Sequence, residues 1–311
     1  MEFIDIENIF GFEKDFKDLE VKEDKFKNFY FKKVKFRSTL QSMYDENNFI
    51  YGYIFYPEKN YNGINIIAIH PVHEAYPAFE YACVYYFTKR CYKVSYISLP
   101  YHRERTPKGK KCGELFFSNE DEDYFFSMRQ SVVDLRHFIY FLKTYENDLN
   151  FYGIGLSLGA ILLNILMGVD NEIKKGVSIM GGGNILRLTW EGLYGISSRR
   201  YYKSKGLNYE TYKKELKEYL NYIEKVKKEK KLIKTDKLWY LVDPLTYSSF
   251  NNPRNVLFIN GIFDFVVVKS SVIELWKNLG KPKLIWIPSS HYFIPVFFPF
   301  VLYLSEMFFK S

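Results

Sequence analysis

The chain has 311 residues, of which 47% are hydrophobic and 20% are aromatic. This composition can fill a large core, so it excludes an intrinsically disordered chain and a collagen-like repeat. The net charge is +8, but residues 199–237 hold 14 basic against 6 acidic side chains and account for all of it. One basic segment is typical of a solvated helical face rather than of a nucleic-acid groove. We therefore expect no nucleic-acid partner.

The cysteines and the terminal segments indicate the cellular compartment in which the protein is expected. Cys83, Cys91 and Cys112 lack metal-ligand spacing, and their odd number argues against a disulfide framework. The first residues are acidic and interrupted, unlike a signal peptide. The apolar stretch 292–309 contains two prolines and a glutamate, unlike a membrane-spanning helix. These features predict a cytoplasmic protein. Peripheral membrane contact is an alternative that we do not expect.

Short apolar runs rich in β-branched and aromatic residues alternate with helical patterns along the chain. The first pair, 31–39 and 49–56, is joined by a polar link and predicts an antiparallel hairpin at one edge of a sheet. The further expected strands are 64–69, 93–99, 150–155, 176–180, 255–259 and 284–287. The expected helices are 78–90, 122–144, 158–167 and 269–279. Several runs are apolar on both faces, so we predict an α/β fold in which helices cover both sides of a largely parallel sheet.

The alternation breaks between residues 184 and 249. This segment has no convincing strand, and its tyrosines and leucines recur at helical spacing among lysines. It predicts an inserted helical cap, or lid. We therefore divide the chain into an N-terminal extension with an edge strand, 1–48, a core formed by 49–183 and 250–311, and the cap, 184–249.

The strongest chemical signal is the sequence Gly155-Leu156-Ser157-Leu158-Gly159, which follows a β-type run and precedes a helix-compatible run. A sharp strand-to-helix turn would hold Ser157 in a strained conformation, and glycines two residues before and after it would relieve the crowding between strand and helix. This is the context of a nucleophile elbow. It predicts that Ser157 is a catalytic nucleophile.

A serine nucleophile needs a base, and the base needs an orienting carboxylate. Asp264 follows one expected strand and a glycine turn, and His291 follows the next expected strand. Both side chains should therefore lie at the carboxyl ends of strands, in the chain order serine, aspartate, histidine. Asp243, which precedes Pro244, is the competing carboxylate, and we favour Asp264.

With these three motifs the chain resembles an α/β-hydrolase from about residue 49 onwards. A narrower likeness, to little-characterised esterase- or lipase-like members, rests on Leu-Pro-Tyr-His at 99–102, followed by Arg and Pro. The resemblance implies the α/β-hydrolase fold, a mostly parallel central sheet flanked by helices, with a helical cap. It also implies hydrolysis of a small-molecule carboxylic ester or other acyl substrate through an acyl-enzyme. The matching catalytic positions are Ser157, Asp264 and His291.

Other function classes stay open. The same machinery serves thioesterases, peptidases and acyltransferases, which the fold and the three residues do not distinguish. A non-catalytic binding protein on this scaffold would be expected to have lost one of the three residues, and all three are present. We therefore place ester hydrolysis first.

The segment 69–74, Ile-His-Pro-Val-His-Glu, occupies the place where α/β-hydrolases usually carry His-Gly followed by an oxyanion donor. Pro71 has no backbone N–H and does not donate. The donor that acts beside the N–H of Leu158 is therefore that of Val72 or of His73. We favour Val72.

The remaining candidate residues are histidines and a tyrosine near the carboxyl ends of strands. We expect His73, Tyr101 and His102 to bind substrate, although Tyr101 and His102 could instead cap a loop. The spacing His70-x-x-His73, with His102 near in topology, also suggests a metal site. No metalloprotease-type spacing accompanies it, and a serine mechanism needs no metal-activated water. We therefore expect neither a metal nor a cofactor.

Overall fold

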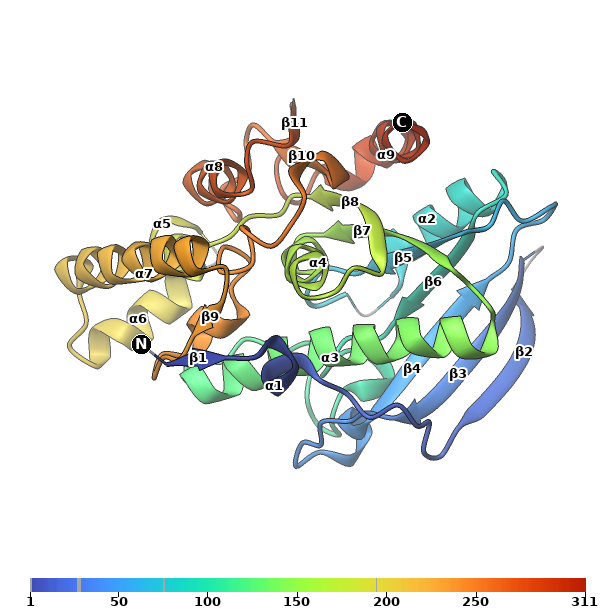
Figure 1. Cartoon of the computed structure of the whole chain (residues 1–311), viewed down its shortest axis with the longest axis horizontal. Coiled ribbons are helices and arrows are strands. Elements are labelled where there is room, and N and C mark those ends of the chain that lie inside the picture. The colour runs from blue at the N-terminus through green and yellow to red at the C-terminus, as the bar shows by residue number, and fades with distance from the viewer. Residues whose placement is uncertain (1, 27–28, 75, 194) are drawn as a thin grey trace.

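The computed structural model describes residues 2–26, 29–74, 76–193 and 195–311. Within them, nine strands form one central sheet: β2 Glu20–Phe26, β3 Phe29–Arg37, β4 Phe49–Phe55, β5 Ile64–Ile69, β6 Lys93–Ile97, β7 Asn150–Leu156, β8 Ile173–Ile179, β10 Val256–Gly261 and β11 Lys283–Ile287. Their order across the sheet is β11-β10-β8-β7-β5-β6-β4-β3-β2 (Figure 1). The strands from β11 to β6 are parallel to one another, and β4, β3 and β2 are antiparallel to their neighbours.

Helices cover both faces of this sheet (Figure 1). On one face lie α2 Ala78–Thr88 and α9 Phe298–Lys310, whose buried side chains share a core with Ile66, Ile154 and Ile259 of the strands. On the other face lie α3 Asp121–Tyr145 and α4 Leu158–Val169, which share a core with Ile67, Phe151 and Phe258. Successive strand residues point to opposite faces, so both faces of the strands must be apolar. The predicted mostly parallel sheet with flanking helices is confirmed.

The edge of the sheet differs from the expected one. β2 pairs with β3 outside the predicted hairpin of β3 and β4, so β3 is not the edge strand. The β2 sequence is Glu-Val-Lys-Glu-Asp-Lys-Phe, which has no apolar alternation to reveal a strand. Pairing comes from the β3 ladder and from ion pairs such as Lys35 Nζ to Glu20 Oε1 at 2.9 Å. Charged side chains on an edge strand also discourage pairing with another chain.

The cap segment, 184–249, contains three helices in its described part: α5 Ile185–Glu191, α6 Ile196–Ser204 and α7 Tyr209–Glu229. The Asn208 side chain accepts the backbone N–H groups of Glu210 and Thr211, and this capping box starts α7. The apolar stripe of α7 is buried, whereas its lysines are exposed. The helix is therefore amphipathic, and its lysine-rich face is in contact with solvent.

Two smaller elements attach the cap to the rest of the chain. The two-residue strand β9 Leu232–Ile233 pairs with β1 Phe3–Ile4, so the N-terminal segment reaches the cap. α1 Ile6–Phe10 packs on α3, where Glu7 forms an ion pair with Arg136 at 2.8 Å. We expected no strand in the cap, and two residues are too few to produce a periodic pattern.

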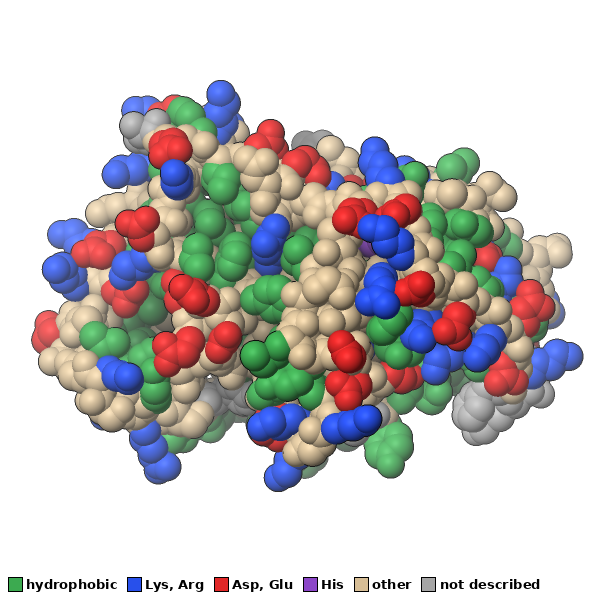
Figure 2. All heavy atoms as spheres, turned by 90° about the horizontal axis from the view of Figure 1, so that it is seen from below, with side chains coloured by type: hydrophobic (Ala, Val, Ile, Leu, Met, Phe, Trp, Pro, Cys, Tyr) green, Lys and Arg blue, Asp and Glu red, His purple; other side chains and the backbone are tan. Residues whose placement is uncertain are grey.

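The positive charge of the cap is not gathered into one patch on the face that Figure 2 shows. Lysine and arginine side chains there are interspersed with aspartate and glutamate side chains, with apolar side chains between them. Over the part of the chain that the structure describes, no helix is both long and apolar enough to cross a membrane.

Candidate active site

Ser157 lies in the turn between β7 and α4. Its backbone has φ +54° and ψ −113°, a conformation that residues other than glycine rarely adopt. A Cβ on Gly155 would overlap the carbonyl oxygen of Gly159, and a Cβ on Gly159 would overlap the carbonyl oxygen of Ile69. The two glycines therefore allow the strand, the turn and the helix to approach closely, and the serine is held where β7 ends.

Ser157, His291 and Asp264 form a chain of hydrogen bonds. Ser157 Oγ lies 2.9 Å from His291 Nε2, and His291 Nδ1 lies 2.8 Å from Asp264 Oδ2. The other carboxylate oxygen, Asp264 Oδ1, accepts the backbone N–H groups of Val266 and Val267 at 2.8 and 2.9 Å. Asp264 follows β10 and His291 follows β11, so two loops at one edge of the sheet supply these side chains. The structure thus brings the three residues named from the sequence together.

Asp243, the competing carboxylate, has other partners. One oxygen accepts the N–H groups of Asn184 and Leu245, each at 2.9 Å, and the other accepts the N–H of Ile185 at 2.7 Å. All three donors lie at or near the start of α5 and in the turn that follows Asp243 itself. Asp243 therefore connects the start of the cap with the turn near its end, and Asp264 is the carboxylate that contacts His291.

The loop after β5, residues 70–74 and here called the β5 loop, faces the serine. Val72 and Leu158 both line the cavity that contains Ser157. Leu158 is the first residue of α4, so its N–H has no acceptor within the helix. The N–H of His73 is donated to His102 Nε2 at 3.2 Å. Of the two β5-loop donors considered from the sequence, Val72 is the one that this bond leaves available.

Tyr101 and His102 do not line the cavity, although we expected them to contact substrate. Both are buried. The N–H of Tyr101 is donated to Asn47 Oδ1 at 2.9 Å, and its ring packs against Tyr44. Of the three expected substrate-binding residues, His73 alone belongs to the cavity wall.

The histidines considered for a metal site are bonded to the backbone. His70 Nε2 accepts the N–H of Leu99 at 3.0 Å, and its Nδ1 lies 2.7 Å from the carbonyl oxygen of Pro71. His102 Nδ1 lies 2.8 Å from the carbonyl oxygen of Pro100. Burial lowers the pKa of His102 to about 3 and that of His70 well below its usual value. Among the described residues, no group of three or more His, Cys, Asp or Glu side chains is arranged to hold a metal ion.

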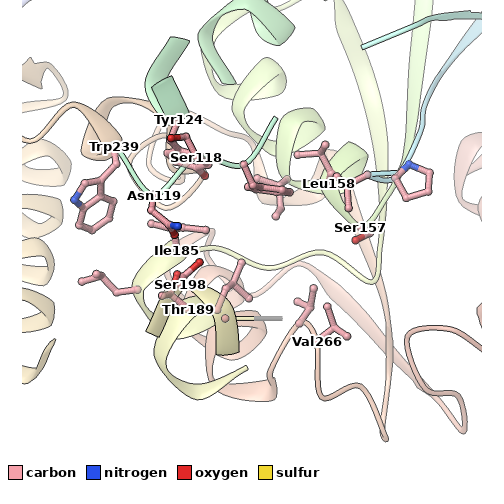
Figure 3. A pocket seen from close by; sticks show the side chains of 18 of the residues that line it. Ser118, Asn119, Tyr124, Ser157, Leu158, Ile185, Thr189, Ser198, Trp239 and Val266 are labelled. Carbon is pink, nitrogen blue, oxygen red and sulfur yellow. The ribbon is translucent and has the colours of Figure 1, made fainter. Parts of the chain in front are cut away.

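Ser157 lines a cavity of about 840 Å³ that extends beneath the cap (Figure 3). Figure 3 shows Ser157, Leu158 and Val266 at one end and Trp239, Asn119 and Ser118 at the other. Most of the wall is apolar or aromatic, and includes Phe79, Phe117, Tyr124, Ile161, Leu186, Leu188, Trp190, Tyr202, Tyr212, Ile294 and Phe298. Charged groups gather at the far end, where Lys237 forms an ion pair with Glu215 at 2.6 Å.

No protein-family model and no curated protein matches the sequence. Solved structures do match. A cold-adapted esterase from an Arctic intertidal metagenomic library is 13% identical with a TM-score of 0.57, over 94% of this chain and 98% of that one. The Pyrococcus furiosus esterase Pf2001 is 18% identical with a TM-score of 0.56, over 95% and 98% of the two chains. The Pyrococcus horikoshii acylaminoacyl peptidase is 15% identical with a TM-score of 0.56, over 95% of this chain but 42% of the peptidase.

This chain has the α/β-hydrolase fold. In an α/β-hydrolase fold, the carboxyl ends of the parallel strands carry the functional loops. Here β5, β7, β10 and β11 end at the same edge and supply the β5 loop, Ser157, Asp264 and His291.

The sequence did not indicate that the segment before α3 would line the cavity of this α/β-hydrolase fold. The wall includes residues 117–120, which directly precede α3, and Asp121 and Tyr124 in the first turn of α3. Several residues of α5 and α6 also line it. Residues 117–120 have no regular pattern in the sequence. Their place in the wall follows from how the cap meets α3, through contacts such as the N–H groups of Leu238 and Trp239 with Asp121.

Proposed function

We propose that the chain is a serine hydrolase that cleaves carboxylic esters through an acyl-enzyme intermediate. The observation that carries the proposal is the hydrogen-bonded series Ser157 Oγ, His291 Nε2, His291 Nδ1 and Asp264 Oδ2, with distances of 2.9 and 2.8 Å, at the end of a large apolar cavity. Such a series is recognised by its geometry and not by its place in a sequence. The esterases among the structural neighbours add support for ester chemistry.

In the first half of the proposed reaction, His291 Nε2 accepts the proton of Ser157 Oγ while Oγ forms a bond to the ester carbonyl carbon. Asp264 keeps the proton of the neutral imidazole on Nδ1 and stabilises the imidazolium that forms. The N–H groups of Leu158 and Val72 donate to the oxygen of the tetrahedral intermediate. The intermediate then expels the alcohol, which takes the proton from His291, and the acyl group remains on Ser157.

In the second half, water repeats these steps. His291 accepts a proton from the water as its oxygen bonds to the acyl carbon, and the second tetrahedral intermediate uses the same two N–H donors. Its collapse releases the carboxylic acid, and His291 returns the proton to Ser157 Oγ. The enzyme is regenerated, and one water molecule is consumed for each ester bond cleaved.

The volume and the lining of the cavity indicate which substrates it can hold. A volume of about 840 Å³ and a largely apolar wall fit a substrate whose acyl or alcohol portion is apolar and longer than an acetyl group. We propose that this portion extends from Ser157 towards Trp239, along the path in Figure 3. Thioesterase, peptidase and acyltransferase activities use the same residues and are the alternatives.

Labelling with a fluorophosphonate, followed by a substrate panel, tests the proposal. The wild-type protein is expected to be labelled at Ser157, and Ser157→Ala is expected to be unlabelled. The panel compares p-nitrophenyl esters of increasing chain length with a matched thioester and an acyl-peptide anilide. Turnover is expected to be highest for an ester of medium or long chain. Absence of labelling on the folded wild-type protein would contradict catalysis, and higher turnover of the thioester or the anilide would replace the ester by that substrate class.

A further inference from the structure

The β5 loop needs a support, because one of its residues lacks a backbone N–H and another has a strained backbone conformation. Pro71 has no N–H, and His73 has φ +59°. A loop that carries an oxyanion donor must nevertheless hold that N–H in a fixed direction, since a preorganised donor stabilises the intermediate without reorganising during the reaction. The contacts of His73 show what holds the loop.

His102 receives the N–H of His73. The His73 N to His102 Nε2 distance is 3.2 Å, and His102 Nδ1 lies 2.8 Å from the Pro100 carbonyl oxygen. These contacts define one tautomer, because Nδ1 must carry the hydrogen that faces the carbonyl and Nε2 must accept. The ring has no exposed surface, and burial lowers the pKa of His102 to about 3. His102 is therefore a neutral acceptor near neutral pH.

Packing prevents the His102 ring from turning away. A Cβ on Gly113 would lie 2.6 Å from His102 Nε2 and 3.0 Å from His73 Nδ1, and Gly113 has φ +71°. The rings of His70 and Phe116 contact that of His102 edge-on, with centroids 4.9 and 5.5 Å away. Gly113 thus permits the backbone to close over the bond between His73 and His102.

A buried ion-pair group holds the other end of the loop. Glu74 Oε2 lies 2.9 Å from Arg103 Nη2, and Arg103 Nη1 lies 2.6 Å from the buried Glu80. Glu74 Oε1 also accepts the N–H of Phe79 at 3.0 Å. Arg103 directly follows His102 in the chain, so one short segment holds the β5 loop at two adjacent residues.

From these contacts we propose that His102 is a positioning residue for the oxyanion site. Its Nε2 accepts a hydrogen bond from the N–H of His73. This bond fixes the β5 loop so that the N–H of Val72 points to the oxygen of the tetrahedral intermediate, next to the N–H of Leu158. The inference rests on the proposed function. It gives the buried histidine of the Leu-Pro-Tyr-His segment a role in transition-state stabilisation without contact to substrate.

The test compares His102→Leu, which removes the acceptor, with His102→Gln, whose Oε1 can lie near the position of Nε2. His137 is the matched control, since it is also a buried histidine with one backbone contact, at 2.8 Å from the Asp15 carbonyl oxygen, and it lies outside the cavity wall. Each variant is assayed for kcat, KM, and affinity for an alkyl boronic acid, which binds serine hydrolases as a tetrahedral adduct.

His102→Leu is expected to lower kcat by about 10- to 100-fold, as for loss of a group that orients a catalytic partner. KM should change by no more than about twofold, because the lost interaction acts in the transition state. Affinity for the boronic acid should fall by the same factor as kcat/KM. His102→Gln should recover most of the loss, and His137→Leu should keep wild-type kcat.

Two results would overturn the inference in a folded, active protein. One is a kcat of His102→Leu within about twofold of that of His137→Leu, and the other is an equal loss of kcat in His102→Gln and His102→Leu.

If His102→Leu does not fold, His102→Asn replaces it. The shorter asparagine side chain keeps a donor near the position of Nδ1 but does not reach the His73 N–H. Equal activity of the Asn and Gln variants would then overturn the inference. An unlabelled wild-type protein would instead refute the proposed function, and with it the basis of this inference.

Discussion

Asp264 Oδ2 lies 2.8 Å from His291 Nδ1, and the second oxygen of the same carboxylate accepts two backbone N–H groups. The carboxylate is therefore fixed by its own loop before it contacts the imidazole. This arrangement leads to a direct comparison between Asp264 and Asp243, the two carboxylates that the sequence offered for one role.

Asp264→Asn should lower kcat by about 10³- to 10⁴-fold, because the amide favours the wrong tautomer of His291. Asp243→Asn should leave kcat near the wild-type value and lower the free energy of unfolding, since the buried Asp243 accepts three backbone N–H groups. Ester hydrolysis and chemical denaturation of both variants check this. A large loss of kcat in Asp243→Asn with little loss in Asp264→Asn would reverse the assignment.

The pKa of His102 predicts a specific dependence of stability on pH. Its pKa is about 3 in the folded protein and 6.5 as an ordinary histidine, so the unfolded chain binds a proton first as the pH falls. Stability is therefore lost between pH 6.5 and about 3. His102→Gln removes this contribution, and its free energy of unfolding should fall less steeply with decreasing pH, by up to about 1.4 kcal/mol per pH unit. Urea titrations of the two proteins at pH 6.5 and 4.5 measure it, and parallel pH dependence would contradict the buried neutral ring.

The buried ion pair of Arg105 and Asp134 should matter for stability. The Nη1 to Oδ2 distance is 2.7 Å, and neither side chain is exposed. Arg105→Met leaves a buried carboxylate without its cation and should cost about 3–5 kcal/mol of unfolding free energy. The exposed pair of Lys110 and Glu114 is the control, and Lys110→Met should cost no more than about 1 kcal/mol. Similar midpoints of urea unfolding for both variants would contradict the prediction.

Filling the far end of the cavity should change which esters are hydrolysed. Ser198, on α6, lines the cavity and lies away from Ser157 in Figure 3. Ser198→Trp is expected to lower kcat/KM for long-chain p-nitrophenyl esters by about tenfold or more, and to leave acetyl ester hydrolysis nearly unchanged. Its neighbour Ser197 is exposed and outside the wall, so Ser197→Trp is the control. An equal loss for all chain lengths would show that the substrate does not extend beneath α6.

The sequence predicted the sheet well because its parallel strands are buried on both faces, which leaves continuous apolar runs such as that of β5. Ser157, Asp264 and His291 could be predicted from the sequence because the first lies in a strand-to-helix turn and the other two follow the ends of strands. It did not reveal β2, whose pairing depends on ladder hydrogen bonds and charge contacts with β3 rather than on apolar alternation.

Choices that depend on contacts distant in sequence were harder to make. Asp264 and Asp243 both precede turns. They differ in their partners, since Asp264 contacts His291 whereas Asp243 accepts backbone N–H groups at the start of α5 and in its own turn. His102 follows a strand end, as a cavity residue does, but the backbone turns inward at Tyr101, with φ +63°, and buries the ring. Such a turn leaves no pattern in composition or periodicity.

Trapping the acyl-enzyme tests the central claim most directly. The wild-type protein is mixed with an excess of a p-nitrophenyl ester, quenched in acid within the first turnovers, digested, and analysed by mass spectrometry. The account predicts that the peptide containing Ser157 gains the mass of the acyl group, and that Ser157→Ala shows neither the adduct nor hydrolysis. An adduct on another residue, or continued turnover by Ser157→Ala, would contradict it.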